Sequence, residues 1–395
     1  MSAAPEPAGN GDLRPLPANV TVVLAGNHPA DRLLSMERYA RMLHEGLDAR
    51  GIKTLLAVPQ AGLERLPALP KPLRKLARYL DKYLVFPLLL RWRLRGMGPA
   101  IVHVTDQGNG LYLPWLHGFP RVVTNHDLLA IRAALGEFDA HQPKKKRGWG
   151  QRAIRWSLKH AGTVVCVSSK SLEDGRRLLD PAHQRFFHVP NAVDPACLGA
   201  PPAASPSDLP PRYVLHVGGS TWYKNRAGVM RIYAAMRQQV PDCPALVLIG
   251  DALNPGESSA AADLGLDGQI LLRVRPDDSY VRAAYAGAQA LIFPSLEEGF
   301  GWPVLEAMAA GCPVFTSNRP PLTEVGGEVA EYIDPLHPAA AATAILHGLA
   351  QGAPWRMAKA EAGRQWAATF TTSRFVEAMI EAYATTLSPA AKQAR

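Results

Sequence analysis

Cysteine is scarce in this chain. Its four cysteines, Cys166, Cys197, Cys243 and Cys312, are scattered, and no two of them have the spacing of a metal-binding or redox pair. Neither a disulfide framework nor a structural zinc site is therefore expected. Unpaired cysteines are typical of proteins in a reducing compartment, so we expect a cytoplasmic protein.

Long apolar runs are also missing. No uninterrupted apolar run reaches the length of a membrane span, so the sequence predicts no transmembrane helix. The first residues, MSAAPEPAGNGDLRPLPA, include acidic residues and no apolar core, and for this reason we do not expect a signal peptide. We interpret residues 1–17 as a flexible tail.

The length and the charge of the chain set further bounds. A chain of 395 residues is longer than one hydrophobic core usually fills, and its 47% apolar content is typical of a globular protein. Two domains are therefore expected, joined by the proline-rich residues 201–211, PPAASPSDLPP. The formal net charge of +9 permits nucleic acid, an anionic membrane or a phosphorylated ligand as the partner.

Short apolar segments alternate with helical segments in both halves of the chain. In the first half, the expected strands are residues 20–25, 54–58, 101–104, 121–124 and 163–167, and a helix is expected over 35–50. In the second half, the expected strands are residues 213–217, 245–249, 270–274 and 288–293. Such alternation predicts parallel sheets with helices on both faces.

The most informative stretch is residues 293–314, FPSLEEGFGWPVLEAMAAGCPV. The end of an apolar strand is followed by a turn containing Gly299 and Gly301, and then by a helix. Such a unit is an anion site because backbone N–H groups and the helix dipole face one point. Glu298 and Glu306 lie on the same unit, and carboxylates are good acceptors for sugar hydroxyls. The pattern favours a ligand with phosphate and vicinal diols, although an ordinary strand–loop–helix crossover has the same pattern.

A second glycine turn, residues 218–226, GGSTWYKNR, joins the strand at 213–217 to a helix. This turn carries Lys224.

Residues 293–314, with the TSNRPPLTEV and YIDP segments that follow, closely resemble the E-x7-E signature of retaining, nucleotide-sugar-dependent glycosyltransferases of family four. The resemblance is strong over residues 210–335 and weaker before them. It implies the GT-B fold, an α/β fold in which two Rossmann-like parallel-sheet domains face a central cleft and a C-terminal helix crosses back to the first domain. The implied bounds are 18–200 for the acceptor-side domain, 212–372 for the nucleotide-sugar domain and 373–395 for the returning helix.

The resemblance also implies roles for individual residues. Glu306 would hold the ribose diol, Glu298 the hydroxyls of the donor sugar, and Lys224 the diphosphate. His126 follows the strand at 121–124 and maps onto a residue near the donor sugar, where it would donate to a phosphate or a sugar hydroxyl. The remaining implied donor-binding residues are Gly219, Ser220, Asn225, Arg226, Val274, Phe300 and Gly301, and the implied first-loop residues are Gly26 and Asn27.

The chain departs from the family pattern in two places. Relatives usually carry a glycine pair in the first loop, where this chain has only Gly26. Many relatives also place an arginine where this chain has Gly219 or Tyr223, so Arg226 becomes the candidate for the second cation. The resemblance implies no metal and no cofactor, because the nucleotide sugar is a co-substrate.

The implied activity is transfer of mannose or another hexose from a nucleoside-diphosphate sugar to a hydroxyl of a lipid-linked or envelope-polysaccharide acceptor, with retention of configuration. The alternative is a membrane-associated GT-B scaffold without turnover. A nucleotide-sugar epimerase or a glycogen-type synthase fits the length and the short linker less well. A dinucleotide dehydrogenase is not expected, because no GxGxxG segment follows a strand and opens a helix.

Basic and apolar residues are interleaved in two segments of the first half. Residues 71–97 predict two short amphipathic helices broken at Pro87, and residues 144–156 add a cluster of cations and tryptophans. Such helices are typical of an anionic membrane interface, although a core-facing helix with a basic outer face has the same pattern. We expect a peripheral protein on the cytosolic face of the inner membrane. No nucleic-acid partner is expected, since no recognised nucleic-acid motif is present.

Overall fold

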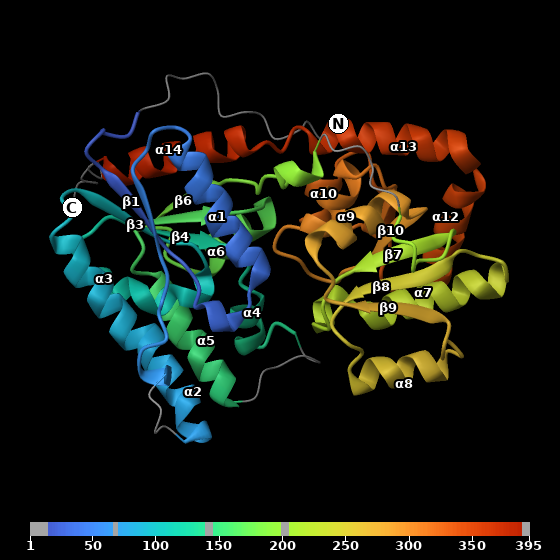
Figure 1. Cartoon of the computed structure of the whole chain (residues 1–395), viewed down its shortest axis with the longest axis horizontal. Coiled ribbons are helices and arrows are strands. Elements are labelled where there is room, and N and C mark those ends of the chain that lie inside the picture. Colours follow the sequence, from blue (N-terminus) through green and yellow to red (C-terminus); the bar gives the residue numbers. More distant parts are fainter. Residues whose placement is uncertain (1–14, 66–69, 139–144, 199–204, 389–395) are drawn as a thin grey trace. The chain divides into compact units, whose positions relative to one another are not determined.

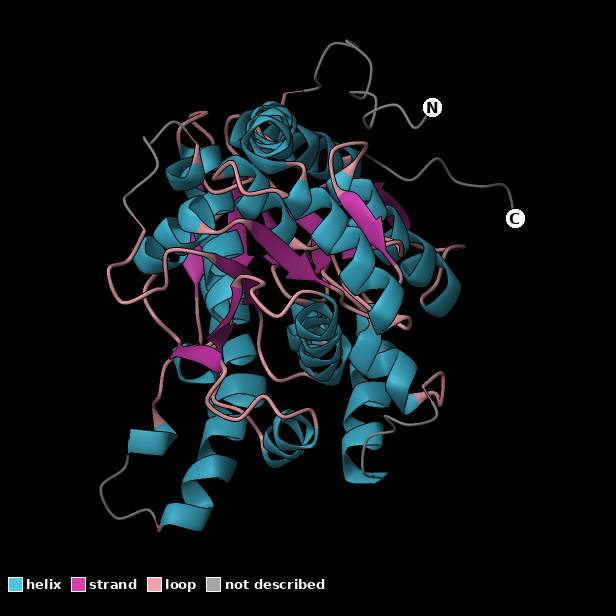
Figure 2. Ribbon diagram, turned by 90° about the vertical axis from the view of Figure 1, so that its right-hand side faces the viewer, coloured by secondary structure: helices cyan, strands magenta, loops and turns pink. Residues whose placement is uncertain are grey.

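The computed structural model describes residues 15–65, 70–138, 145–198 and 205–388. The described residues form two compact units, each with its own sheet and flanking helices (Figure 1). Figure 2 shows helices around the strands. The N-terminal unit holds the described residues up to Asn191 and those from Thr372 onward, and the C-terminal unit holds residues 192–371. Most of the expected tail at 1–17 and the first part of the expected linker at 201–211 lie outside the described residues.

The N-terminal unit contains a parallel sheet with the strand order β2-β1-β3-β4-β5-β6. Its strands are β1 (Thr21–Ala25), β2 (Thr54–Ala57), β3 (Ala100–Val104), β4 (Arg121–Asn125), β5 (Thr163–Cys166) and β6 (Arg185–His188). The strand order reverses between β1 and β3. Such a switch point lets the loops after two adjacent strands diverge, and ligands of open parallel sheets bind there.

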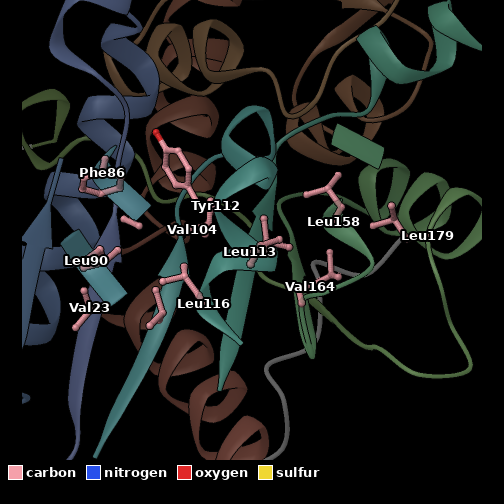
Figure 3. Close-up of a cluster of buried hydrophobic side chains, with 14 of the residues drawn as sticks. Val23, Phe86, Leu90, Val104, Tyr112, Leu113, Leu116, Leu158, Val164 and Leu179 are labelled. Atoms are coloured by element: carbon pink, nitrogen blue, oxygen red, sulfur yellow. The ribbon is translucent and has the colours of Figure 1, made fainter. Parts of the chain in front are cut away.

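The N-terminal unit also contains six α-helices before α14 among its described residues. They are α1 (Leu34–Asp48), α2 (Lys71–Leu80), α3 (Phe86–Arg95), α4 (Leu129–Ala134), α5 (Lys145–Leu158) and α6 (Ser169–Leu178), with the 3-10 segment η4 (Gln107–Leu116). In the core shown in Figure 3, Val23 and Val104 of the strands belong to the same cluster as Phe86 and Leu90 of α3 and Leu158 of α5. A sheet buried on both faces explains why these strands are almost continuously apolar.

The last helix, α14 (Thr372–Leu387), belongs to the N-terminal unit although it follows the C-terminal unit in the sequence. A buried hydrogen-bond chain fixes it. The ring of His103 on β3 pairs with Tyr383 Oη on α14 at 2.7 Å and with Thr124 Oγ1 on β4 at 2.7 Å, and Thr124 Oγ1 also pairs with Tyr39 Oη on α1 at 2.8 Å. This confirms the expectation that a C-terminal helix returns to the first domain.

The C-terminal unit repeats the architecture with the strand order β12-β11-β10-β7-β8-β9, again all parallel. Its strands are β7 (Tyr213–Val217), β8 (Ala245–Gly250), β9 (Ile270–Val274), β10 (Ala290–Phe293), β11 (Val314–Ser317) and β12 (Glu331–Ile333). Its helices are α7 (Arg226–Gln239), α8 (Pro255–Asp263), α9 (Asp278–Gly287), α10 (Trp302–Ala309), α11 (Leu322–Gly326), α12 (Pro338–Ala350) and α13 (Gly352–Ala367). The switch point lies between β7 and β10.

Residues 71–95 form one nearly continuous helical segment, so the predicted break at Pro87 is wrong. A π-helical turn, η3 (Asp81–Val85), joins α2 directly to α3, and Pro87 lies in the first turn of α3. The Phe86 N–H bonds to the Asp81 carbonyl, five residues back. This wider turn accommodates the proline ring and its missing N–H. No helix among the described residues is long and apolar enough to cross a bilayer.

Candidate functional site

Two loops leave the sheet of the C-terminal unit at its switch point. One follows β7 and leads into α7, and the other follows β10 and leads into α10. Because β7 and β10 are parallel neighbours, both loops leave the same edge of the sheet. The loops are also bonded to each other, since Asn225 Nδ2 donates to the Pro294 carbonyl at 2.9 Å and the Leu296 N–H donates to the Tyr223 carbonyl at 2.7 Å.

The loop after β7 brings Lys224 to the start of α7. Lys224 ends a short 3-10 turn, and Asn225 follows it in the left-handed region with φ 55°. The Asn225 side chain accepts a hydrogen bond from the Gly228 N–H and so caps α7. An asparagine tolerates this backbone conformation better than most residues, which explains its place beside the lysine.

The loop after β10 turns sharply at Gly301. Its φ is 112°, and a Cβ atom at this position would lie 2.6 Å from Leu322 Cδ2. Only glycine fits such a position without strain. Gly301 caps the N-terminus of α10, Pro303 lies in the first turn of α10, and Phe300 is buried. The turn predicted from the two glycines is therefore present, with backbone N–H groups at the start of an eight-residue helix.

Lys224 and Glu298 meet where the two loops meet. Lys224 Nζ donates to Glu298 Oε1 at 2.7 Å, and the exposed fractions of the two side chains are 18% and 7%. The ammonium also lies 5.1 Å from the centre of the Phe293 ring. Burial strengthens such an ion pair because water screens it poorly. A cation and a carboxylate from different loops are thus held side by side at the switch point.

Glu306 lies on α10, in the second turn after the N-cap residue Gly301. It is partly buried, and Tyr285 Oη on α9 donates to its Oε2 at 3.3 Å. Tyr285 is itself almost fully buried. The tyrosine therefore helps to orient the Glu306 carboxylate.

Asp251 is a residue that the sequence reasoning missed. It follows β8, and its carboxylate accepts from the Ser220 N–H at 3.3 Å and from Arg275 Nε at 2.8 Å. The hydrogen bond from Arg275 lowers the pKa of Asp251. Asp251 therefore links the glycine turn after β7 to the loop beyond Val274, the residue implied to contact the base. The Gly250-Asp251 pair directly after a strand was the available sequence signal.

Arg226 lies under the glycine turn, where its side chain is almost fully buried. Its Nη1 donates to Ser220 Oγ at 2.8 Å and to the Asp251 carbonyl at 3.0 Å, and Glu257 lies 3.6 Å away. The Arg226 guanidinium is therefore bonded to the loops after β7 and β8 in this structure, and its role as the second cation stays a prediction.

The first loop of the N-terminal unit holds Gly26 and Asn27 after β1. Asn27 is buried, and its Nδ2 donates to Asp106 Oδ2 at 2.6 Å. Asp106 follows β3, the neighbour of β1, so this pair spans the switch point of the N-terminal sheet. The sequence reasoning did not single out Asp106, because only the sheet order brings it to Asn27.

His126 follows β4 and packs edge-on against the Tyr39 ring, with 4.7 Å between the ring centres. Its backbone N–H donates to Gln107 Oε1, and its Nε2 donates to the Thr105 carbonyl at 2.9 Å. Burial lowers the pKa of His126, and the Asp106 carboxylate counters part of this effect. A neutral ring with its proton on Nε2 carries a lone pair on Nδ1, so this nitrogen accepts hydrogen bonds and does not donate them.

The described residues thus form two groups. Gly219, Ser220, Lys224, Asn225, Arg226, Val274, Glu298, Phe300, Gly301 and Glu306 belong to the C-terminal unit, and Gly26, Asn27 and His126 belong to the N-terminal unit. Most residues of each group lie in loops that follow strands, or in the helices that these loops enter, close to the switch point of their own sheet, whereas Val274 ends the edge strand β9.

Comparison with solved structures identifies the fold as GT-B. Sucrose-phosphate synthase from Thermosynechococcus elongatus matches with a TM-score of 0.72 at 19% identity, over 92% of this chain and 98% of that chain. WaaG, a glycosyltransferase involved in lipopolysaccharide biosynthesis, matches with a TM-score of 0.64 at 14% identity, over 94% of this chain and 100% of that chain. At these identities the likeness shows the fold alone.

Comparison of sequences gives the family. Residues 36–196 match the model for Glycosyltransferase Family 4, and residues 211–351 match the model for Glycosyl transferases group 1. O-antigen chain mannosyltransferase B of Escherichia coli is 27% identical over 327 residues, which are 79% of this chain and 81% of that protein. A GDP-mannose:cellobiosyl-diphosphopolyprenol alpha-mannosyltransferase of Xanthomonas oryzae pv. oryzae is 27% identical over 219 residues, 54% of this chain and 53% of that protein. The chain belongs to glycosyltransferase family 4 and is a glycosyltransferase.

Proposed function

We propose that this glycosyltransferase moves mannose from GDP-mannose to a hydroxyl of a lipid-linked saccharide, with retention of configuration. The observation that carries the proposal is the Lys224–Glu298 ion pair between two glycine turns at the β7/β10 switch point. The printed names of the two sequence relatives, both mannosyltransferases and one of them GDP-mannose-dependent, support the choice of sugar and base.

The diphosphate would bind at the two turns. Backbone N–H groups at Phe300 and Gly301 and the N-terminus of α10 would face one phosphate, and Ser220 and Lys224 would face the other. As the glycosidic bond breaks, negative charge grows on the leaving diphosphate, and a preorganised ammonium group and helix end stabilise that charge. Arg226 acts as a positioning residue here, because it holds Ser220 through a 2.8 Å hydrogen bond.

The carboxylates would bind the diols of the donor. Glu306, oriented by Tyr285, would accept from the ribose hydroxyls, and Val274 would lie against the base. Glu298 would accept from mannose hydroxyls once the phosphate draws Lys224 away from it. His126, with Nδ1 as an acceptor, would take a hydrogen bond from a sugar hydroxyl instead of giving one.

The proposed chemistry needs no bound metal. Lys224, the backbone N–H groups and the helix dipole would supply the positive charge that a divalent cation supplies in other transferases. A leaving phosphate oxygen would take the proton of the acceptor hydroxyl as the new bond forms on the same face of the sugar. Glu298 either positions the sugar or forms a covalent intermediate, and both routes give retention.

The acceptor would be reached at a membrane surface. Phe86, Leu90 and Leu94 of the segment α2–η3–α3 are buried in the core. One face of this segment therefore packs against the core, as expected for a core-facing helix. Large apolar side chains cover the outer face as well. These exposed side chains are Leu73, Leu76, Tyr79, Leu80, Leu84, Leu88, Leu89 and Trp92.

The charges of this outer face are positive. Arg74, Lys75, Arg93 and Arg95 are exposed, whereas Asp81, the one acidic residue of the segment, is buried. On α5, Trp149 and Trp156 are exposed with Arg152 between them, and the cations at 144–147 lie outside the described side chains. Exposed aromatic and aliphatic side chains among cations fit the interface of an anionic bilayer. These side chains support our proposal that the protein binds peripherally to the cytosolic face of the membrane.

A transfer assay tests the proposal. The purified protein is incubated with radiolabelled GDP-mannose and a panel of farnesyl-diphosphate-linked saccharides, and the configuration of the new linkage is read from its one-bond carbon–proton coupling. An α-mannosyl product from the wild type, absent with Glu298→Gln, is expected. A β-linked product would contradict retention, and equal turnover by the variant would show that the site is misplaced. GDP-mannose binding without transfer to any member of the panel would favour the scaffold without turnover.

A further inference from the structure

An exposed arginine, Arg275, lies on the loop after β9 in a backbone conformation that arginine rarely adopts. Its φ is 46°, and its side chain is 64% exposed. The left-handed region is unfavourable for a residue with a Cβ atom, and such a conformation persists only where the surroundings hold it. The Arg275 N–H donates to the Gly250 carbonyl at 3.0 Å. This bond fixes the backbone of the arginine at the end of β8, although its side chain faces solvent.

The Arg275 guanidinium has one bonded edge and one open edge. Its Nε donates to Asp251 Oδ1 at 2.8 Å, and its Nη2 lies 2.6 Å from the same oxygen. A guanidinium carries five N–H groups in a planar fork. Nη1 has no hydrogen-bond partner among the described residues, so N–H groups of Nη1 and Nη2 remain at the end of the fork. Two parallel donors of this kind suit a ligand with two neighbouring acceptors.

Asp251 connects this arginine to the turn proposed for the diphosphate. Its Oδ2 accepts from the Ser220 N–H at 3.3 Å, and a Cβ atom on Gly219 would lie only 2.8 Å from the same oxygen. The carboxylate therefore uses space that a side chain at position 219 would fill. Since β7, β8 and β9 are parallel neighbours, the loops that follow them leave one edge of the sheet. A nucleotide with its diphosphate at the first loop can thus place its base at the third.

The charge of the Asp251–Arg275 pair favours a neutral partner over a phosphate. The hydrogen bond from Arg275 lowers the pKa of Asp251, so the carboxylate stays ionised at neutral pH and balances the guanidinium. A balanced arginine offers directed N–H groups without net charge. Val274, directly before it, is 56% exposed and gives an apolar surface for the flat face of a ring. Directed donors beside an apolar surface fit a nucleobase.

Among the common bases, guanine matches the open edge of Arg275. Guanine has two neighbouring acceptors, N7 and O6, and arginine pairs with both through parallel hydrogen bonds. Adenine has an amino group in place of O6, so a donor would face the guanidinium. Pyrimidines have no N7. Guanine therefore accepts from two N–H groups at positions where the other bases accept from at most one.

We propose that Arg275 selects the base of the donor by donating hydrogen bonds from its open edge to N7 and O6 of guanine, with Asp251 as the positioning residue that orients the guanidinium. The inference rests on the proposed function, because it explains the choice of a guanosine donor over other nucleotide sugars. It adds a specificity-determining residue to the donor site. Lys224 and Glu298 would contact groups that many nucleotide sugars share.

The test is calorimetric titration of the full chain with GDP, ADP, UDP and 7-deaza-GDP, in which a C–H group replaces N7. The wild type is compared with Arg275→Gln and with Arg275→Lys, which keeps the charge but loses the fork. Arg231→Gln is the matched control, because Arg231 is an exposed arginine on α7 in the same unit. The ratio of two affinities is measured in one protein preparation, so partial unfolding of a variant does not imitate the effect.

The wild type is expected to bind GDP at least about tenfold more tightly than 7-deaza-GDP, ADP or UDP, since hydrogen bonds from a charged donor are strong and the pair of bonds discriminates between bases. Arg275→Gln and Arg275→Lys are expected to lose most of this preference. Arg231→Gln is expected to keep it.

A preference for GDP that survives in Arg275→Gln would overturn the inference and leave the donor site standing. An equal loss of affinity for all four nucleotides in Arg275→Gln would also overturn it, because such a loss would assign Arg275 to the diphosphate. Failure of the wild type to bind any of the nucleotides would instead overturn the proposed donor site, and this inference with it.

Discussion

The two units share a parallel six-stranded plan, yet they arrange their charged groups differently. In the C-terminal unit, Lys224 and Glu298 lie in short glycine turns and are paired and largely enclosed. In the N-terminal unit, cations such as Arg65, Arg74 and Arg93 are exposed beside apolar side chains, on loops and helices at the surface. The contrast fits a unit that holds one small polar donor and a unit that meets a larger, amphiphilic partner.

The largest effect is expected from removing the cation of the paired site. Lys224→Met would leave the charge of the leaving diphosphate without its ammonium and leave Glu298 buried without its partner. Turnover is expected to fall by about 10²–10³-fold, the usual effect of losing one preorganised charge-stabilising group. Steady-state kinetics with GDP-mannose measures the change.

Lys359→Met is the matched control, because Lys359 in the same unit pairs with Glu331 away from the turns. It is expected to keep wild-type turnover. A loss of the same size in both variants would point to general instability of the unit, and little loss in either would remove Lys224 from the site.

A smaller effect is expected from Glu306, whose role is in binding. Glu306→Gln keeps the shape but removes the charge that accepts from a diol, so the affinity for GDP is expected to fall about tenfold. Turnover at saturating donor should change much less. Titration of GDP, together with kinetics at high donor concentration, separates the two. If Glu306→Gln kept full affinity for GDP but lost turnover, Glu306 would act in the transfer step and not in binding the ribose.

Binding of lipid vesicles tests whether the exposed apolar and basic side chains of the N-terminal unit contact a membrane. Trp92 and Trp149 are exposed by 74% and 75%, and replacing both by serine is expected to reduce partition onto anionic vesicles about tenfold. Met357→Ser, which changes an exposed apolar side chain of the C-terminal unit, is the control and should leave partition unchanged. Equal partition of the wild type onto neutral and anionic vesicles at low salt would contradict membrane binding through the N-terminal unit.

Each unit also contains a buried histidine whose lowered pKa makes the stability of the fold depend on pH. Burial lowers the pKa of His103 in the N-terminal unit to about 3 and that of His216 in the C-terminal unit to about 4, from the ordinary 6.5. Below pH 6.5 the unfolded chain binds protons that the folded chain does not. Stability is therefore full above pH 6.5 and falls as the pH drops towards 4, by roughly 1 kcal/mol per pH unit for each histidine.

Denaturant unfolding between pH 7.5 and 4.5 measures this slope, with His103→Gln and His216→Gln each expected to reduce it. His160→Gln is the control, since His160 is a partly exposed histidine at the end of α5. A slope that neither buried-site variant changes would show that other groups control acid stability.

The smallest effect is expected from removing metal ions. If Lys224 and the helix end carry the charge of the diphosphate, turnover with excess EDTA should equal turnover with magnesium. Loss of activity in EDTA, restored by magnesium or manganese, would show that the donor site is completed by a cation.

The sequence predicted the turns of the C-terminal unit better than the side-chain contacts of either unit, for a physical reason. Gly299, Gly301 and Lys224 act through the local turns in which they stand, so their spacing alone indicates the geometry. Asp251 and Asp106 act through the order of the strands, which no local pattern contains. The π-helical turn before Pro87 depends on packing of α3 against the core, so the proline alone gave the wrong expectation of a break.

The most direct test of the donor site is a thermal-shift panel. The wild type and Lys224→Ala are each incubated with GDP-, UDP-, ADP- and TDP-sugars, and the midpoint of thermal unfolding is measured. A ligand that binds only the native state stabilises it by roughly 2.7 kcal/mol at about 100 times its Kd. GDP-mannose is expected to raise the midpoint of the wild type more than the other nucleotides, and to have little effect on the variant. No shift with any nucleotide, or the same shift in both proteins, would contradict a donor site between the two glycine turns.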